Sequence, residues 1–155
     1  MFSNRSFILL MGLAMWLVAC QNPTSSGPSG DQANRQPLSA EDSLYRQVMD
    51  VHDEVMPKMG KIRGAQQQAQ QRLDSLALQT RGVDKAYRRQ LEQLVSDLNY
   101  ADFAMDKWMV EFNIDSAKDN KALRMQYLQD ELEKVKKVKV AILGSLAGAD
   151  SLIRR

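Results

Sequence analysis

Residues 40–79 read AEDSLYRQVMDVHDEVMPKMGKIRGAQQQAQQRLDSLALQ, and their apolar pattern predicts a long helix. Its apolar residues repeat at spacings of mostly three, four and seven: Leu44, Val48, Val51, Val55, Ile62, Ala65, Ala69, Leu73 and Leu76. That period places them on one face of an amphipathic helix. Ser39 followed by Asp42 predicts a capped helix start. Pro57 predicts a kink near residues 53–57, because proline removes a backbone hydrogen bond.

Two further helices follow in the same pattern. A turn at residues 80–83 comes first, with Gly82 as the helix stop and Asp84 as the next N-cap. The apolar face of the second helix consists of Tyr87, Leu91, Leu94, Leu98, Met105, Met109 and Phe112. Residues 113–116 turn the chain again. The apolar face of the third helix consists of Met125, Leu128, Leu132, Val135, Ile142 and Leu146.

Loops this short make consecutive helices antiparallel neighbours. We therefore expect an all-α fold, an antiparallel up-down-up bundle of three long, coiled-coil-like helices within residues 39–155. The expected helices span about 40–79, 84–113 and 117–147, and the last ends where Gly144 and Gly148 weaken it.

The N-terminus has the pattern of a bacterial lipoprotein signal. Arg5 precedes an uncharged apolar stretch from Phe7 to Ala19, and Leu17-Val18-Ala19-Cys20 resembles a lipobox. Cys20 is then the diacylated first residue of the mature chain, and residues 1–19 are a removed signal peptide. The alternative is a retained transmembrane anchor, but the apolar core of about a dozen residues falls short of the roughly 20 that a spanning helix needs.

Residues 20–38 are rich in Ser, Pro, Gly, Asn and Gln, which predicts a flexible linker after the lipidated cysteine. With a coil reach of roughly 5–6 Å × √n, about 18 residues hold the bundle about 25 Å from the membrane. Gln21 stands where an aspartate would favour retention at the inner membrane. The expected location is the cell envelope, with the chain lipid-anchored at the periplasmic face of the outer membrane.

Composition argues against several functional classes. Without Arg5, the 21 basic residues fall to 20 against 19 acidic ones, so the mature chain lacks the charge of a nucleic-acid-binding protein. The sequence holds one histidine and one cysteine, and it has no glycine-rich phosphate loop or Gly-x-Ser-x-Gly motif. We therefore expect that the protein is not an enzyme.

The methionines concentrate in one part of the predicted bundle. With the first turn centred near residue 81, residue i of the first helix lies level with about residue 162 − i of the second, so His52 faces the level of Val110. The same reasoning at residue 116 places Met125 level with Lys107. The resulting layer contains the histidine and Met49, Met56, Met59, Met105, Met109 and Met125.

Two interpretations of this layer stay open. Methionine is a flexible gap-filler, so the layer can be ordinary core beside the kink, with Trp108 at its rim. Thioether and imidazole ligands also select Cu(I), which makes the layer a candidate copper site. The candidate ligands are Met49, His52, Met56, Met59, Met105 and Met109. In that site, Trp108 is the residue expected to stack on the cation.

Carboxylates near the layer offer a third possibility. They are Asp53, Glu54, Asp102 and Asp106. Asp102 falls within the apolar arc of the second helix, where a charge needs a partner. The candidate partners are His52, Lys58 and Lys107. A di-iron site is excluded, because it needs a Glu-x-x-His motif on each of two helices and the chain has one histidine.

Two blocks of sequence resemble a known group of proteins. They are VMDVHDEVMPKMG at residues 48–60 and ADFAMDKWMVEF at residues 101–112. Together with the signal segment, they resemble a family of small, uncharacterised lipoproteins of Bacteroidota, whose members often carry the label "viral A-type inclusion protein". Members tend to have a second methionine where this chain has Asp106. The resemblance implies a lipid-anchored helical protein and no particular activity.

The sequence thus predicts a lipid-anchored, non-catalytic binding or structural module of the cell envelope. Its expected partners are the membrane, through the N-terminal lipid, and either an envelope protein or a second copy of the chain, without nucleic acid. The alternative is a Cu(I)-binding or copper-stress lipoprotein that uses the methionine and histidine layer.

Overall fold

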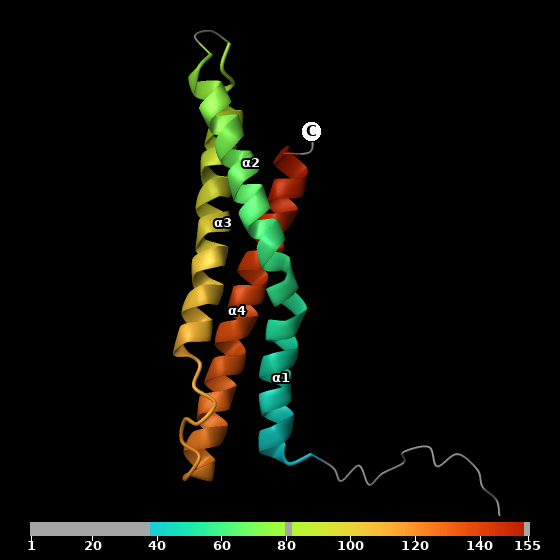
Figure 1. The fold of residues 1–155 in the computed structure, drawn as a ribbon, viewed down its shortest axis with the longest axis vertical. Coiled ribbons are helices and arrows are strands. Elements are labelled where there is room, and N and C mark those ends of the chain that lie inside the picture. Colours follow the sequence, from blue (N-terminus) through green and yellow to red (C-terminus); the bar gives the residue numbers. More distant parts are fainter. Residues whose placement is uncertain (1–37, 80–81, 154–155) are drawn as a thin grey trace, which may run out of the picture. The chain divides into compact units, whose positions relative to one another are not determined.

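Helices and their connections make up the described part of the chain. A computed structural model describes residues 38–79 and 82–153, all within one compact unit of residues 36–155. Its elements are α1 (Ala40–Val55), the 3₁₀ turn η1 (Met56–Lys58), α2 (Met59–Ala77), α3 (Lys85–Glu111) and α4 (Lys121–Ile153). Figure 1 shows α1 and α2 running up, α3 down and α4 up, which confirms the all-α, up-down-up three-helix bundle. The predicted signal peptide, Cys20 and the linker to residue 37 lie outside the described residues.

Two predicted helix starts are confirmed by their caps. The Ser39 hydroxyl accepts a hydrogen bond from the backbone N–H of Asp42 at 3.1 Å. The Asp84 carboxylate accepts from the N–H groups of Ala86 and Tyr87 at 2.8 and 3.1 Å. Gly82 lies just before this second cap, and its φ of +75° is the left-handed conformation that glycine adopts without strain.

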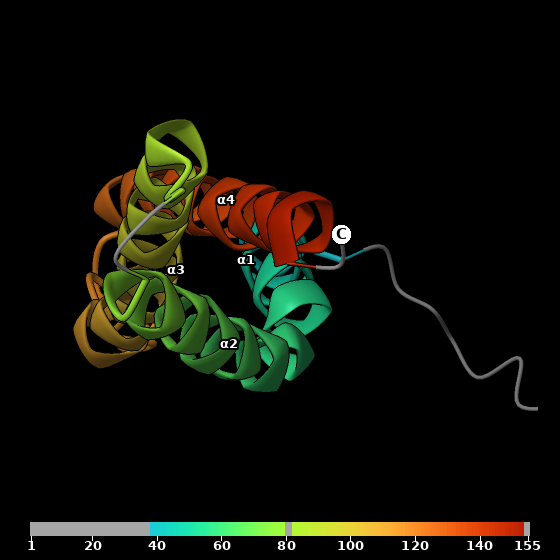
Figure 2. The ribbon, with the colours of Figure 1, turned by 90° about the horizontal axis from the view of Figure 1, so that it is seen from above.

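The predicted first helix consists of α1, η1 and α2, and the helix against which it packs changes at η1. α1 packs along α4, whereas α2 packs mainly along α3, and α1 and α3 have little backbone contact. Figure 2 shows from above how α2 runs from the end of α1 toward α3. Pro57 has no backbone N–H to donate, so the regular α-helical hydrogen bonding is interrupted at η1. Lys58 Nζ donates to the Glu54 carbonyl oxygen at 2.8 Å. The predicted kink is therefore confirmed as a single 3₁₀ turn between α1 and α2. We call α1 with η1 and α2, α3, and α4 the three rods of the bundle.

Each of the three rods contributes a buried stripe to one core. The fully buried apolar residues are Val48, Val55, Ile62, Ala69, Leu91, Leu98, Ala101, Met105, Leu128, Val135 and Ile142. Complete burial of a Val, Leu, Ile or Met side chain contributes roughly 1.5–3 kcal/mol, so these stripes hold the bundle together. Among the described helices, none is both long and apolar enough to cross a membrane.

The third helix differs from its predicted bounds at both ends. It begins at Lys121 rather than near residue 117, because Ala117 has a φ of 58° and Asn120 caps the helix by accepting from two backbone N–H groups. It continues past residue 147 to Ile153. Ala149 and Ile153 are buried, and Arg72 donates to the Ile153 carbonyl oxygen. Core packing thus outweighs the cost of glycine in a helix, about 1 kcal/mol at each position.

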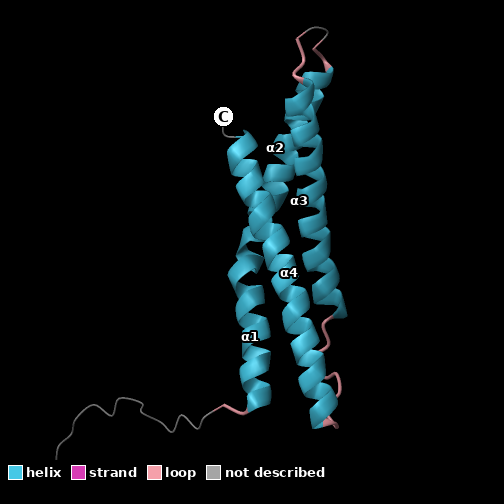
Figure 3. Cartoon of the chain, turned by 180° about the vertical axis from the view of Figure 1, so that it is seen from behind, coloured by secondary structure: helices cyan, strands magenta, loops and turns pink. Residues whose placement is uncertain are grey.

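The predicted register is confirmed at the first turn and wrong at the second. His52 packs against Trp108, within one helical turn of the predicted level at Val110. Met125, however, does not lie level with Lys107. Phe112 stacks on Tyr127 at 6.2 Å, so Met125 lies beyond the end of α3. The reason is that the connection after α3 folds alongside the start of α4, as Figure 3 shows, rather than reversing at once.

Candidate functional site

Burial divides the predicted methionine ligands into two groups. Met59 and Met105 lie in the core and are 3% and 0% exposed. Met49 is half-buried, and Met56 and Met109 are each 36% exposed. The core interpretation therefore describes Met59 and Met105. The other three methionines are partly exposed to solvent, so the residues of the predicted layer do not share one degree of burial.

Asp53 orients the imidazole of His52. The Nδ1 atom lies 2.8 Å from Asp53 Oδ1, and the His52 side chain is 17% exposed. A carboxylate accepts hydrogen bonds, so Nδ1 is the donor, and in the neutral form of the ring this leaves the lone pair on Nε2. Histidine ligands in metal sites have this same arrangement, in which an outer carboxylate fixes the ring and its tautomer.

Aromatic rings fill the space between α1 and α3. The rings of Tyr45, His52, Trp108, Phe112 and Tyr127 form what we call the aromatic cluster. The centroid of Trp108 lies 5.6 Å from that of His52 and 5.0 Å from that of Phe112. Phe112 also stacks on Tyr45 at 6.5 Å and on Tyr127 at 6.2 Å. Each aromatic pair contributes about 0.5–1.5 kcal/mol beyond burial. The cluster therefore joins the three rods at the end of the bundle where α1 and α4 begin and α3 ends.

Trp108 is a core residue of this cluster rather than a rim residue. Its side chain is 5% exposed, and its Nε1 atom has no hydrogen-bond partner in the described part of the chain. The cation found over an aromatic ring among the described residues is Arg124, whose Cζ lies 5.9 Å from the Tyr127 centroid. Trp108 itself packs against Phe112 and His52, as the ring distances show.

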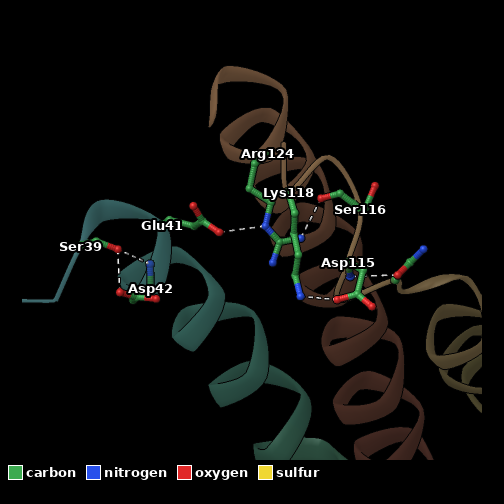
Figure 4. A network of polar contacts seen from close by, with 8 residues as sticks. Ser39, Glu41, Asp42, Asp115, Ser116, Lys118 and Arg124 are labelled. Carbon is green, nitrogen blue, oxygen red and sulfur yellow. Dashed lines mark hydrogen bonds and ion pairs between the residues drawn. The ribbon is translucent and has the colours of Figure 1, made fainter. Parts of the chain in front are cut away.

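Arg124 closes the same end of the bundle and was not among the predicted site residues. Its side chain is 4% exposed, and its guanidinium donates from Nε to Glu41 Oε1 at 3.1 Å and from Nη1 to the Ser116 carbonyl oxygen at 2.9 Å (Figure 4). It thereby ties α4 both to the start of α1 and to the connection after α3. A sequence signal existed, because Arg124 precedes Leu128 by one turn on the apolar stripe of the third helix.

Glu131 is a second buried charge that the sequence interpretation missed. It lies between Leu128 and Val135 on the same stripe, and its side chain is 3% exposed. Lys134 Nζ donates to Glu131 Oε1 at 2.8 Å, whereas Oε2 has no partner among the residues described. This hydrogen bond, aided by the negative charges of Glu131 and Glu111 against partial burial, raises the pKa of Lys134.

The carboxylates near the predicted layer are held by cations of the fold. Asp102 accepts from Arg63 Nε at 3.1 Å rather than from any of its three candidate partners, and Asp106 Oδ1 lies 3.9 Å from Arg63 Nη2. Glu54 pairs with Lys139 of α4. Within residues 38–79 and 82–153, no group of three or more His, Cys, Asp or Glu side chains is arranged to hold a metal ion.

Three exposed apolar side chains share one face of α3, with Lys107 between two of them. Tyr100 and Phe103 are each 62% exposed, and Val110 is 86% exposed. At 100° per residue these side chains lie within about 80° of one another, so they share one face of the helix. We call these three residues the outer ridge. The ridge was not predicted, because its residues lie off the apolar face by which the second helix was recognised.

Comparisons of the chain with protein-family models, with curated proteins and with solved structures find no match. The resemblance to the Bacteroidota lipoproteins therefore stays a prediction from the two sequence blocks.

Proposed function

We propose that the chain is a lipid-anchored, non-catalytic binding module of the bacterial cell envelope. Cys20 is its attachment point, and the periplasmic face of the outer membrane is its location. The lipobox-like tetrapeptide before the only cysteine and the polar linker that follows it support the anchor. The partner is an envelope protein or a second copy of the chain.

The outer ridge is the observation that carries the binding role. Large apolar side chains gathered on one exposed helix face are typical of protein-contact surfaces. The opposite face of α3 is buried in the core through Leu91, Leu98 and Met105, so the helix is fixed in place and the ridge is presented on a rigid support.

A binding role also fits the polar groups of the candidate site better than catalysis does. The imidazole of His52 is hydrogen-bonded to Asp53, and the Asp102 and Glu54 carboxylates are ion-paired with residues of other helices. These groups hold the helices in register. A general acid or base needs a side chain that can reach a substrate, and ion pairs within the fold keep these carboxylates from that role.

The anchor is tested by membrane fractionation. In cells, the chain should float with membranes and incorporate a radiolabelled fatty acid, and Cys20→Ser should abolish the label. Labelling that persists in Cys20→Ser would refute the assignment of Cys20. A wild-type chain recovered without label would refute lipidation altogether.

The binding surface is tested by site-specific photocrosslinking in intact cells. A photoreactive amino acid at Phe103 should give one discrete adduct, and the same group at Gln71, an exposed position on α2, should give none. Val110→Asp in the same chain should remove the Phe103 adduct. An adduct twice the mass of the chain identifies self-association. No adduct from position 103, or equal adducts from both positions, would contradict the proposal.

Cu(I) binding is a second candidate function, and the geometry of His52 favours it. In the neutral ring, the contact with Asp53 places the proton on Nδ1, which leaves the Nε2 lone pair to ligate a metal ion. Met49 and Met56 lie within about 40–60° of His52 around the same helix and are not sealed in the core. The candidate ligand set thus narrows to His52 with Met49, Met56 and Met109.

A Cu(I) titration against a competing chelator separates the two candidates. His52→Gln and Met56→Leu should each weaken binding about tenfold or more, as loss of a ligand does. Met105→Leu is the matched control, because Met105 is fully buried among apolar residues and should leave the affinity within about twofold. Absence of sub-micromolar binding, or binding that survives both substitutions, would reject the copper function.

A further inference from the structure

The outer face of α3 carries opposite charges at equal distances from Tyr100. Arg89 precedes Tyr100 by eleven residues, and Glu111 follows it by eleven. Eleven residues make three helical turns plus about 20°, so the three side chains lie close to one line along the helix. At 1.5 Å per residue, each charge stands about 16 Å from Tyr100. The two ends of this exposed face are therefore equidistant from its centre and opposite in sign.

Both of these charges can take a partner from outside the chain. Arg89 is exposed and makes no ion pair or hydrogen bond with the residues that the structure describes, whereas its neighbour Arg88 donates to Glu92. Glu111 lies 3.8 Å from Lys107, and the two side chains are 56% and 55% exposed. Pairs this exposed contribute about 0–1 kcal/mol, so Glu111 can exchange Lys107 for another cation at little cost.

A second pair of opposite charges is arranged in the same way about Tyr100. Tyr100 of α3 and Val140 of α4 line one pocket between the two helices, so they lie at one level. Asp97 precedes Tyr100 by three residues, and Lys137 precedes Val140 by three. Because α3 and α4 run in opposite directions (Figure 1), the two charges lie on opposite sides of that level, each about 4.5 Å from it. Both side chains are exposed, and neither is ion-paired within the described part of the chain.

We propose that this face of α3 and α4 binds a second copy of the chain, with the two copies antiparallel and related by a twofold axis at the level of Tyr100. The inference rests on the proposed binding role and assigns its partner. The axis exchanges the two ends of the face. Arg89 of each copy then lies opposite Glu111 of the other, and Asp97 lies at the level of Lys137 of the other. Each pair occurs twice, as in any interface between identical surfaces.

Charge and apolar area together favour the antiparallel arrangement over a parallel one. In a parallel pair each residue faces its own copy, so Arg89 would meet Arg89 and Glu111 would meet Glu111, and like charges repel. In the antiparallel pair only Tyr100 meets its own copy. The two Phe103 residues then lie about 9 Å apart along the helices, a distance that their rings can span. Tyr100 and Phe103, each 62% exposed in the single chain, are thus covered at the centre of the interface.

Single-cysteine variants test the arrangement. The purified chain beginning at residue 21 keeps the compact unit of residues 36–155 and lacks Cys20, so an introduced cysteine is its only thiol. A short bismaleimide should link Tyr100→Cys to itself, and should link Arg89→Cys to Glu111→Cys when the two variants are mixed. Arg89→Cys should not link to itself, because its two copies would lie about 33 Å apart. A self-linked Arg89→Cys dimer would overturn the antiparallel arrangement, and a Tyr100→Cys chain that stays unlinked would overturn the second copy as partner.

A charge exchange tests the pairing itself. By sedimentation velocity, Arg89→Glu and Glu111→Arg should each weaken dimerisation about fivefold or more, because each places two like-charged pairs in the dimer. The double variant with both changes should return to within about twofold of the wild type. Leu123→Asp is the control, since Leu123 is 55% exposed and lies near the start of α4, outside the face, and it should have no effect. A double variant as weak as the single variants would refute the pairing.

Failure of this inference is distinguishable from failure of the proposed binding role. A monomeric purified chain, together with a Phe103 adduct to a different envelope protein in cells, would overturn the second copy as partner and leave the binding role in place. Absence of any Phe103 adduct, with a monomeric purified chain, would contradict both. Circular dichroism of each variant verifies that a loss of dimer is not a loss of fold.

Discussion

Lys134 Nζ lies 2.8 Å from Glu131 Oε1, one helical turn away on α4, and the two side chains differ sharply in exposure. The Glu131 side chain is 3% exposed, whereas that of Lys134 is 56% exposed. The cation therefore reaches in from the surface to a carboxylate in the core. Because Glu131 Oε2 has no partner among the described residues, this one lysine compensates the buried charge.

Lys134→Met should destabilise the bundle more than a surface ion pair would suggest. Removing one partner leaves a buried charged group unsatisfied, which costs about 1–3 kcal/mol or more. Lys136→Met is the control, because its partner Glu133 is 65% exposed and the loss should stay below about 1 kcal/mol. Urea unfolding followed by circular dichroism measures both. Adding Glu131→Leu to Lys134→Met should restore most of the lost stability, and failure to do so would contradict this account.

The contribution of the same pair should disappear at alkaline pH. The hydrogen bond to Glu131 raises the pKa of Lys134 above its ordinary value of 10.5. A group whose pKa is raised by folding stabilises the fold fully below its unfolded pKa, and that contribution is lost as the pH rises through the folded value. The free-energy difference between the wild type and Lys134→Met should therefore be constant from neutral pH to about pH 10 and shrink as the pH rises above 10.5, the ordinary pKa of lysine. A difference that stays constant to higher pH would show that the charge of Lys134 is not responsible.

Trp108→Phe should cost little for a buried tryptophan. Its Nε1 atom makes no hydrogen bond with the described residues, so the substitution removes volume and no polar contact. We expect a loss of about 1–2 kcal/mol, against about 3–5 kcal/mol for Trp108→Ala. Urea unfolding measures both variants. A loss from Trp108→Phe as large as that from the alanine variant would indicate that Nε1 has a partner in solution, such as an ordered water.

The fold was predictable to different extents at its two turns. At the first turn, Gly82 and the Asp84 cap mark the helix ends in the sequence. The residue of α3 that lies beside His52 could therefore be predicted to within one helical turn. At the second turn, Asn113 Oδ1 accepts from the backbone N–H of Asp115 in the connection, and Asn120 Oδ1 accepts from those of Ala122 and Leu123 at the start of α4. These side-chain contacts lengthen the connection, and the apolar pattern holds no sign of them. The error in the level of Met125 arose there.

The candidate site was predictable in composition more than in arrangement. The proximity of His52 and Trp108 followed from register. Which methionines are buried and which are exposed depends on how far the kink rotates α2 relative to α1. Helical periodicity does not predict that rotation. Arg63 as the partner of Asp102 was missed because it lies almost two turns beyond Pro57, where the changed direction of α2 brings it against α3. Charged residues on the stripe of the third helix were the neglected signal.

The glycines of α4 and of the first turn should respond to alanine in opposite directions. The helix continues through Gly144, where an added Cβ meets no atom within 4 Å, so Gly144→Ala should stabilise the fold by about 0.5–1 kcal/mol. Gly148→Ala gains the same propensity and places its Cβ 3.4 Å from Leu94 Cδ1, an ordinary contact.

Gly82→Ala is the contrasting variant, because the φ of +75° is left-handed and should cost alanine about 1–2 kcal/mol. The midpoints of urea unfolding should be higher than that of the wild type for Gly144→Ala and Gly148→Ala, and lower for Gly82→Ala. Destabilisation by Gly144→Ala would show that α4 does not run as a regular helix through that position, and the extension of the helix to Ile153 would then be wrong.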